Sequence, residues 1–274
     1  MTRGSDSCTG MRQEDDMAAQ NYKFIISYDG TRYYGWEHQP GTEMTIQGKL
    51  EAVLTKMLEA TSGEAPQSPV AVIGAGRTDA GVHARAMVAN AWLDTPLSEK
   101  EIQRYMNRYL PDDISVNEVR PAADRFHSRY KATGKTYRYT LWHGENGETP
   151  VFERKYVCVL KEAPEISRMQ EAAEYLVGEH DFKSFCGNSH MKKSTVRVVD
   201  SIRVETSGHY IRIYYHGSGF LQNMVRILTG TLLEVGYGRL SPEDMKGILE
   251  VRDRRKAGPT APAAGLCLMK VDYD

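Results

Sequence analysis

A glycine-rich loop at residues 74–81 carries the side chains best suited to chemistry. It places three glycines within eight residues, and between them stand Arg77, Thr78 and Asp79. Glycine allows unusual backbone angles and the close approach of a ligand, so this loop could hold a cation and a carboxylate against a bound molecule. An ordinary Asx-type turn with Arg77 in solvent fits the same residues equally well.

The loop does not match the nucleotide-binding patterns that glycine-rich loops often form. The dinucleotide fingerprint G-x-G-x-x-G would require glycine at position 79, where this chain has Asp79. The chain also has no Walker A sequence. A nucleotide-dependent oxidoreductase is therefore disfavoured.

A second candidate feature is the basic segment 125–138, RFHSRYKATGKTYR. It contains no acid and five basic side chains: Arg125, Arg129, Lys131, Lys135 and Arg138. Aromatic residues are interleaved with them, a composition that suits phosphate contacts combined with base stacking. A solvated basic strand and loop is the ordinary alternative. Basic clusters at 192–197 and 252–256 could extend this RNA-binding surface, although neighbouring acidic residues lower the net positive charge of the second cluster.

The composition is that of a globular protein, since 41% of the 274 residues are hydrophobic and 26% are charged. No apolar run reaches the roughly 20 residues of a membrane span, and residues 1–20 lack the apolar core of a secretory signal. We therefore expect a cytoplasmic protein with no membrane segment.

The four cysteines are far apart, which disfavours a disulfide scaffold, and a zinc site would need scattered ligands. With a net charge of −1, any RNA-binding surface must come from local clustering.

Hydrophobic periodicity predicts strands and helices that do not alternate strictly. Strands are expected at 23–28, 70–73, 86–93, 135–142, 155–160, 196–205, 210–215 and 266–271. Helices are expected at 46–58, 98–110, 166–177 and 220–235, and a further one from 241 onward. This pattern favours an α+β fold with a largely antiparallel central sheet flanked by helices. Residues 1–20 are expected to be a flexible leader, within which Met11 and Met17 are candidate start residues.

Residues 76–84, GRTDAGVHA, closely resemble the signature of the TruA family of tRNA pseudouridine synthases. Other blocks resemble the family in the same order: YDGTRYYGW at 28–36, FHSRY at 126–130, YRY at 137–139, FLQNMVR at 220–226 and GLCL at 265–268. The resemblance covers residues 22–273, which is nearly everything except the leader.

The resemblance implies roles for four residues. The family's nucleophilic loop aspartate corresponds to Asp79, and the helix arginine that pairs with it corresponds to Arg226. The tyrosine that stacks on the flipped uracil corresponds to Tyr137, and the loop arginine that fills the space left by the base corresponds to Arg77. Without the resemblance, the helix pattern predicts that Arg226 is a solvated arginine outside the apolar face of its helix. The strand pattern likewise predicts that Tyr137 is a core or cross-strand tyrosine.

The resemblance also implies the pseudouridine synthase fold, with two similar halves, 21–124 and 125–274, around an active-site cleft. The implied activity is isomerisation of uridine to pseudouridine in the anticodon stem-loop of tRNA, around positions 38–40, by a homodimer that needs no metal or organic cofactor. The expected RNA-binding residues are Phe126, His127, Ser128, Arg129, Tyr130, Lys131, Lys135, Arg138, Ser184, Phe185, Lys192 and Lys193. Cys186 stands near a position where family members often carry arginine. The alternative function is a non-catalytic tRNA-binding or chaperone protein on the same fold.

Overall fold

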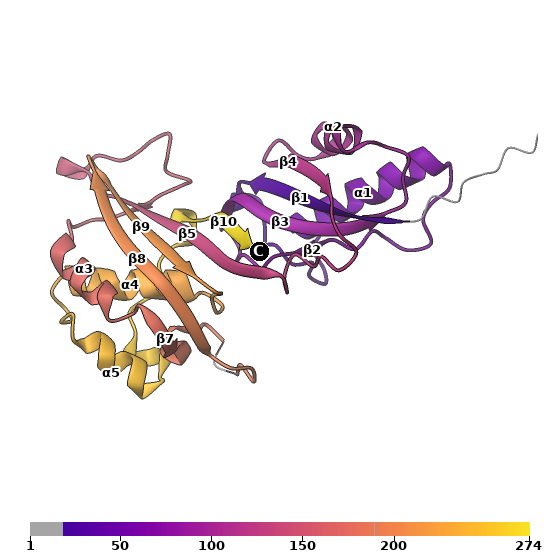
Figure 1. Cartoon of the computed structure of the whole chain (residues 1–274). Coiled ribbons are helices and arrows are strands. Elements are labelled where there is room, and N and C mark those ends of the chain that lie inside the picture. Colours follow the sequence, from indigo (N-terminus) through magenta and orange to yellow (C-terminus); the bar gives the residue numbers. More distant parts are fainter. Residues whose placement is uncertain (1–18, 189) are drawn as a thin grey trace, which may run out of the picture.

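One mixed β-sheet runs through the computed structural model, which describes residues 19–188 and 190–274 (Figure 1). Its strand order is β4-β1-β3-β10-β5-β9-β8-β7, with β2 beside β3 and β6 beside β5. The strands are β1 (Gln20–Tyr28), β2 (Ile73–Gly74), β3 (His83–Leu93), β4 (Ile114–Pro121), β5 (Ala132–Trp142), β6 (Cys158–Val159), β7 (Gly178–Asp181), β8 (Val196–Ser207), β9 (Tyr210–Gly217) and β10 (Leu266–Tyr273). The α-helices are α1 (Ile46–Ser62), α2 (Glu99–Tyr109), α3 (Ile166–Glu174), α4 (Met224–Gly236) and α5 (Asp244–Val251).

The pairing of these strands confirms the expected α+β fold. Within the described residues, neighbouring strands are antiparallel except for two short parallel pairs, β3 with β10 and β5 with β6. No helix in the described part of the chain is long and apolar enough to cross a membrane.

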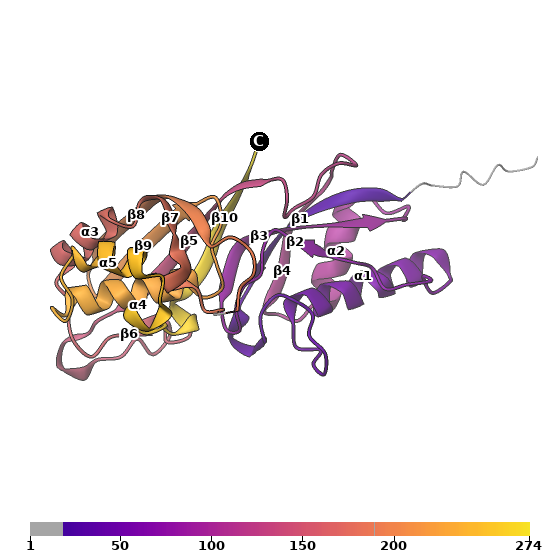
Figure 2. The ribbon, with the colours of Figure 1, turned by 90° about the horizontal axis from the view of Figure 1, so that it is seen from below.

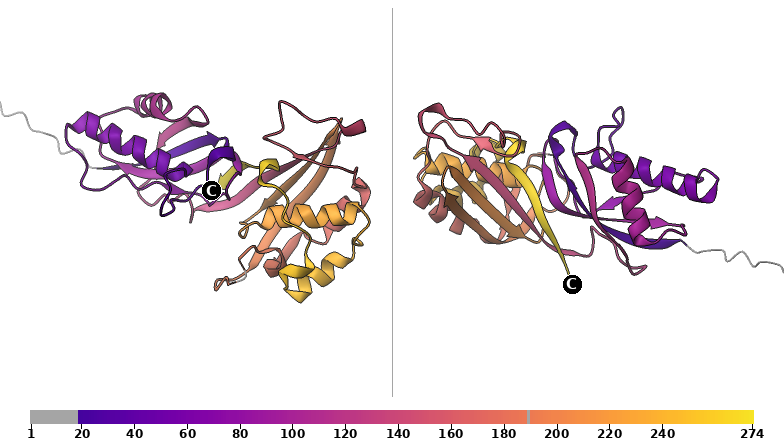
Figure 3. Two further views of the ribbon diagram at one scale, coloured as in Figure 1. Left: turned by 180° about the vertical axis from the view of Figure 1, so that it is seen from behind. Right: turned by 90° about the horizontal axis from the view of Figure 1, so that it is seen from above.

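The sheet carries two lobes that share strand β10 (Figures 1 and 2). The first lobe contains β1 to β4 with α1 and α2, and the second contains β5 to β9 with α3 to α5. Figure 3 shows that the helices of each lobe stay with that lobe's strands. The chain passes from the first lobe to the second at residues 122–131, between β4 and β5. The division into halves 21–124 and 125–274 stays a prediction. Residues 1–18 of the expected leader lie outside the described residues, and Gln20 already belongs to β1.

Side chains at the helix ends explain where two helices begin. The hydroxyl of Thr45 accepts a hydrogen bond from the backbone N–H of Gly48 at 3.2 Å and caps α1. Ser98 and Glu101 form the capping box that opens α2. The two helices were expected to begin at residues 46 and 98, and they begin at Ile46 and Glu99.

Several expected elements differ from the structure. The strand expected at 155–160 is shorter, because only Cys158 and Val159 pair with the last two residues of β5, and residues 155–157 form a turn and a bend. The helix expected from 220 begins at Met224, since the preceding Asn223 has a left-handed backbone with φ of 58°. The helix expected over 166–177 ends at Glu174, and α5 begins at Asp244. Strands β4 and β7 were not predicted.

Candidate active site

The centre of the candidate site is a partly buried ion pair between the two lobes of the chain. Asp79 lies in the loop between β2 and β3, and Arg226 lies in the first turn of α4. The Nη1 atom of Arg226 is 3.5 Å from Oδ2 of Asp79, and their side chains are only 18% and 26% exposed. The structure therefore brings together two residues that are 147 positions apart in the sequence.

Burial and positive charge act in opposite directions on the Asp79 carboxylate. Burial raises the pKa of Asp79 above its ordinary value, because a carboxylate loses hydration when it leaves water. The Arg226 guanidinium and a hydrogen bond from the backbone N–H of Asn223 lower the pKa and offset part of that effect. An anion held in this way can attack or stabilise an electron-poor carbon.

The segment at 28–36 holds the loop that carries Asp79 in place. The Tyr28 hydroxyl shares a 2.8 Å hydrogen bond with the hydroxyl of Thr78, which is buried. The backbone N–H of Trp36 donates to the carbonyl of Thr78 at 3.1 Å, and the N–H of Gly81 donates to the carbonyl of Tyr33 at 3.2 Å. Two of the family-like blocks are therefore one packing unit, and Asp79 is at its edge.

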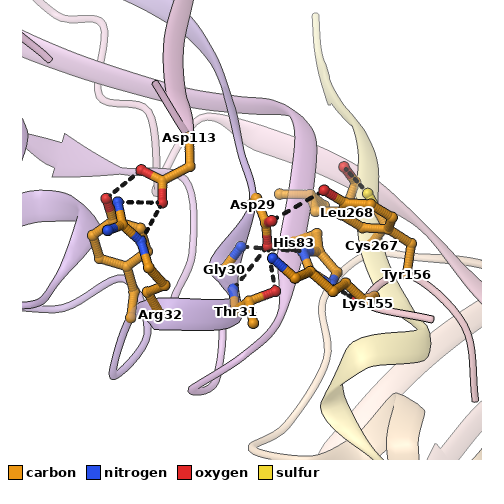
Figure 4. Close-up of polar contacts among 11 residues, drawn as sticks. Asp29, Gly30, Thr31, Arg32, His83, Asp113, Lys155, Tyr156, Cys267 and Leu268 are labelled. Carbon is orange, nitrogen blue, oxygen red and sulfur yellow. Dashed lines mark hydrogen bonds and ion pairs between the residues drawn. The ribbon is translucent and has the colours of Figure 1, made fainter. Parts of the chain in front are cut away.

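His83 fixes the other end of the loop. It is buried, with Nδ1 accepting from the N–H of Gly30 at 3.1 Å and Nε2 3.0 Å from the carbonyl of Lys155, which assigns the proton to Nε2 (Figure 4). Burial lowers the pKa of His83 despite the nearby Asp29 carboxylate. His83 also lines an open cavity of about 690 Å³ together with Asp29 and Tyr156. These contacts fit a residue that packs the loop.

Arg226 is anchored by two neutral oxygens in addition to Asp79. Its Nε donates to the carbonyl of Ala261 at 2.7 Å, and its Nη1 donates to Oδ1 of Asn223 at 2.8 Å. Its helix, α4, is buried along most of its length, so the backbone that carries the guanidinium is held by packing. The solvated arginine that the helix pattern alone would suggest is wrong, because the guanidinium folds back over the helix start.

Segment 258–262, which supplies the Ala261 carbonyl, lies unusually close to α4. A Cβ atom added at Gly230 would be 1.8 Å from the carbonyl oxygen of Pro259, far inside contact distance. The backbone N–H of Ala261 also donates to the carbonyl of Arg226 at 3.1 Å. Glycine at position 230 therefore allows the approach that anchors the arginine.

Replacing Gly230 by alanine is expected to push segment 258–262 away from α4. We expect a loss of about 1–3 kcal/mol in the free energy of unfolding, the usual cost of overpacking a core, and a lower turnover rate because Ala261 moves away from Arg226. Urea unfolding and single-turnover kinetics measure the two effects. The matched control is Gly247→Ala in α5, where the added Cβ meets nothing within 4 Å. Equal stability of the two variants would contradict the prediction.

Tyr137 lies beside the ion pair. It is on β5, only 8% exposed, and its ring meets Phe220 edge-on with centroids 5.3 Å apart. Burial raises the pKa of Tyr137, and the nearby Asp79 carboxylate adds to the shift. The site thus combines an anion, a cation and an aromatic wall. Arg77, in contrast, is exposed on the loop and pairs with Glu37.

The expected RNA-binding residues fall into exposed and buried groups. Arg129, Tyr130, Lys131, Lys192 and Lys193 are exposed, whereas Phe126 and His127 are partly buried. Lys135 is on the same strand as Tyr137, two residues earlier, and its Nζ would be 3.0 Å from a Cβ added at Gly76. Arg138 follows Tyr137 directly, so its side chain is on the other face of β5, where it lines the cavity with His83.

Three of the expected RNA contacts are corrected by the structure. Ser128, Ser184 and Phe185 have no exposed surface, so they cannot touch RNA in this conformation. The Ser128 hydroxyl donates to the carbonyl of Ile73, and the Ser184 hydroxyl donates to the carbonyl of Ile248. Phe185 packs in the core, as does the neighbouring Cys186. These residues are part of the protein interior.

Asn223 was missed by the sequence analysis. It precedes α4, and both its backbone and its side chain reach the ion pair. The signal available was its place within FLQNMVR, three residues before Arg226, but spacing alone does not show which way an asparagine points.

Comparisons with known proteins point to one family. The family model described as tRNA pseudouridine synthase matches residues 24–131 and 172–274, more than half of the chain. The curated "tRNA pseudouridine synthase A" of Bacillus sp. (strain KSM-64) is 45% identical over 253 residues, which are 92% of this chain and 99% of that protein. The "tRNA pseudouridine synthase A 2" of Clostridium perfringens (strain 13 / Type A) is 42% identical over 254 residues, 93% of this chain and 100% of that protein.

A solved chain from a Cbf5-Nop10-Gar1 complex is 14% identical with a TM-score of 0.36, covering 90% of this chain and 49% of that one, a likeness too weak to support an argument. The family model and the curated relatives suffice without it. This chain belongs to the TruA family of tRNA pseudouridine synthases.

Proposed function

We propose that this chain isomerises uridine to pseudouridine in the anticodon stem-loop of tRNA, around positions 38–40. The observation that carries the proposal is the partly buried pair of Asp79 and Arg226 beside the ring of Tyr137. A binding protein has no need of a buried carboxylate facing a polyanion. The family to which the chain belongs supports the same activity.

The chemistry needs an anion at the sugar. Breaking the bond between N1 of uracil and C1′ of ribose leaves an electron-poor sugar, which the Asp79 carboxylate captures or stabilises. The uracil leaves as a resonance-stabilised anion, turns, and bonds to C1′ through C5, which breaks any bond formed between Asp79 and C1′ and restores the free carboxylate. The proton on C5 is then lost and N1 gains one, so the product is an isomer of the substrate.

The target base must leave the RNA stack before it can react. Tyr137 stacks on the extruded uracil, a contact worth roughly 1–3 kcal/mol, and Arg77 fills the vacated space. Arg77 is exposed and, within the described residues, pairs with Glu37 alone, an arrangement that supports a role in which it exchanges partners when RNA binds.

The activity is tested by tritium release from tRNA transcripts labelled at uridine C5. We expect the wild-type chain to release tritium, and transcripts with uridine restored singly at positions 38, 39 and 40 identify the target. No release while tRNA remains bound would favour the non-catalytic binding protein instead. Release from uridines outside the anticodon stem-loop would overturn the proposed substrate.

The enzyme is a cytoplasmic homodimer in which one tRNA spans both subunits. Support comes from the net charge of −1, because two subunits together build a longer basic surface than one nearly neutral monomer offers. Light scattering of the purified protein, with and without tRNA, measures the number of subunits, and a monomer in both conditions would contradict this part of the proposal.

Lys135 makes tRNA affinity depend on pH. Burial and the neighbouring cations Arg129 and Arg197 lower the pKa of Lys135 to about 8, so its charge is lost as the pH rises through that value. Phosphates favour the protonated form, and we therefore expect tRNA affinity to fall between about pH 7 and pH 9. Lys135→Arg keeps the charge over this range and is expected to bind with much weaker pH dependence. Filter binding at constant salt makes the comparison, and identical pH profiles would contradict the role of Lys135.

A further inference from the structure

Asn223 touches both members of the ion pair. Its Oδ1 accepts from Nη1 of Arg226 at 2.8 Å, and its backbone N–H lowers the pKa of the Asp79 carboxyl group. An asparagine at this position before a helix usually turns its side chain onto the helix N–H groups. The side chain of Asn223 makes no such capping bond and is used on the arginine.

The distances around Arg226 show which contacts hold it. Its bonds to the neutral oxygens of Ala261 and Asn223 are 2.7 and 2.8 Å long, whereas its approach to Asp79 is 3.5 Å. In a close bidentate salt bridge, a guanidinium donates one hydrogen bond to each oxygen of the carboxylate. Here Nη1 is shared between Asn223 and Asp79, and its shorter contact is the one to Asn223, so the guanidinium holds the carboxylate only loosely.

The backbone of Asn223 is held in an uncommon conformation. Its φ of 58° and ψ of 4° are left-handed, a state that costs a residue other than glycine about 1 kcal/mol or more and persists only where the surroundings fix it. Gly187 supplies part of that fixing: its N–H donates to the carbonyl of Gln222 at 2.8 Å. A Cβ at Gly187 would be 2.6 Å from Nδ2 of Asn223, so only a residue without a side chain leaves room for the Asn223 side-chain amide.

We propose that Asn223 is a positioning residue that holds Arg226 at a distance from Asp79, so that the pair stays ionised while the carboxylate remains free to attack the ribose. The inference rests on the proposed function, because it assigns Asp79 as the nucleophile. Asn223 itself does not react.

Two substitutions at this position are expected to change the ion pair in opposite ways. In Asn223→Gly the left-handed backbone is retained, but Nη1 of Arg226 loses its acceptor and closes onto Asp79. The pKa of Asp79 then falls. In Asn223→Asp the new carboxylate pairs with Arg226 and repels Asp79, so the pKa of Asp79 rises. Both changes lower kcat on the order of tenfold with little effect on the KM for tRNA.

The test is carbon-13 NMR of the aspartate carboxylates in the tRNA-free protein, with the Asp79 signal assigned by its loss in Asp79→Asn, together with single-turnover tritium release. The matched control is Asn146→Gly, at an exposed asparagine with a similar φ of 52°. We expect shifts of opposite sign in the two Asn223 variants and no shift in the control. Shifts of the same sign, no shifts, or wild-type kcat in both variants would overturn the proposal.

The two readouts separate this inference from the proposed function. Failure of the wild-type protein to release tritium would refute the activity, whereas the NMR titration would still report whether Asn223 controls the ion pair. Thermal unfolding of each variant shows that it remains folded.

Discussion

Asp79→Asn is expected to abolish pseudouridine formation, with a loss on the order of 10⁴-fold or more in single-turnover tritium release. The amide keeps the size and shape of the carboxylate but carries no negative charge to stabilise or capture the sugar. We expect tRNA affinity to stay within a few fold of wild type, since Arg226 keeps its anchors on Ala261 and Asn223 when the carboxylate is gone. Filter binding measures this second quantity.

Asp94→Asn is the control for Asp79→Asn, because Asp94 is an exposed aspartate that follows β3. It should leave both rate and affinity unchanged. Continued turnover of Asp79→Asn would show that another group is the nucleophile. A large loss of tRNA binding would show instead that Asp79 is structural.

Arg226→Met is expected to have the second largest effect. It removes the cation that offsets the burial of Asp79, so the pKa of Asp79, already raised by burial, should rise further. Loss of one preorganised electrostatic partner typically costs about 10²–10³-fold in kcat. Because the proposed reaction needs the ionised carboxylate, the acid limb of the pH–rate profile should move to higher pH, and raising the pH should recover part of the rate.

Arg226→Lys distinguishes charge from geometry. An ammonium group keeps the positive charge but cannot bind the Ala261 carbonyl and the Asn223 amide in the planar arrangement of a guanidinium. We therefore expect a smaller change in the pKa of Asp79 than in Arg226→Met, but still a clear loss of rate. Arg239→Met is the control. Arg239 is an exposed arginine just after the end of α4, and it pairs with Glu234 in that helix. An unshifted acid limb in Arg226→Met would contradict the electrostatic role.

The elements that sequence patterns predicted well are those whose signals are local. Thr45 and Ser98 cap their helices through bonds to residues three positions away, so composition and spacing suffice to find them. Strand β4 is different. Its buried Ile114 and Val116 alternate with exposed residues, but a register shift opposite Ile25 and Ile26 interrupts the pattern before Val119, and the polar residues between weaken it further.

The candidate site was predictable only in part, because its residues meet through tertiary packing. The loop signature identified Asp79, yet nothing local to the helix shows that Arg226 folds back over its first turn. Ser184 and Phe185 show the converse, since a short helical turn buries side chains that motif position alone placed at the RNA. Charge counts located basic residues but not the face of the sheet on which each one projects, as Arg138 illustrates.

Strand β10 has a consequence for when the enzyme becomes competent during synthesis. It follows every other described strand, yet it joins the lobes by pairing Cys267 with His83 in β3 and Leu266 with Tyr139 in β5. Ala261, which anchors Arg226, is made only a few residues earlier. While these residues are still inside the ribosome, Asp79 is already made, but its partner Arg226 is not yet anchored by Ala261. A nascent chain at this stage can hold folded pieces of each lobe while the Asp79–Arg226 pair is still incomplete, and we therefore expect incomplete translation products to be inactive.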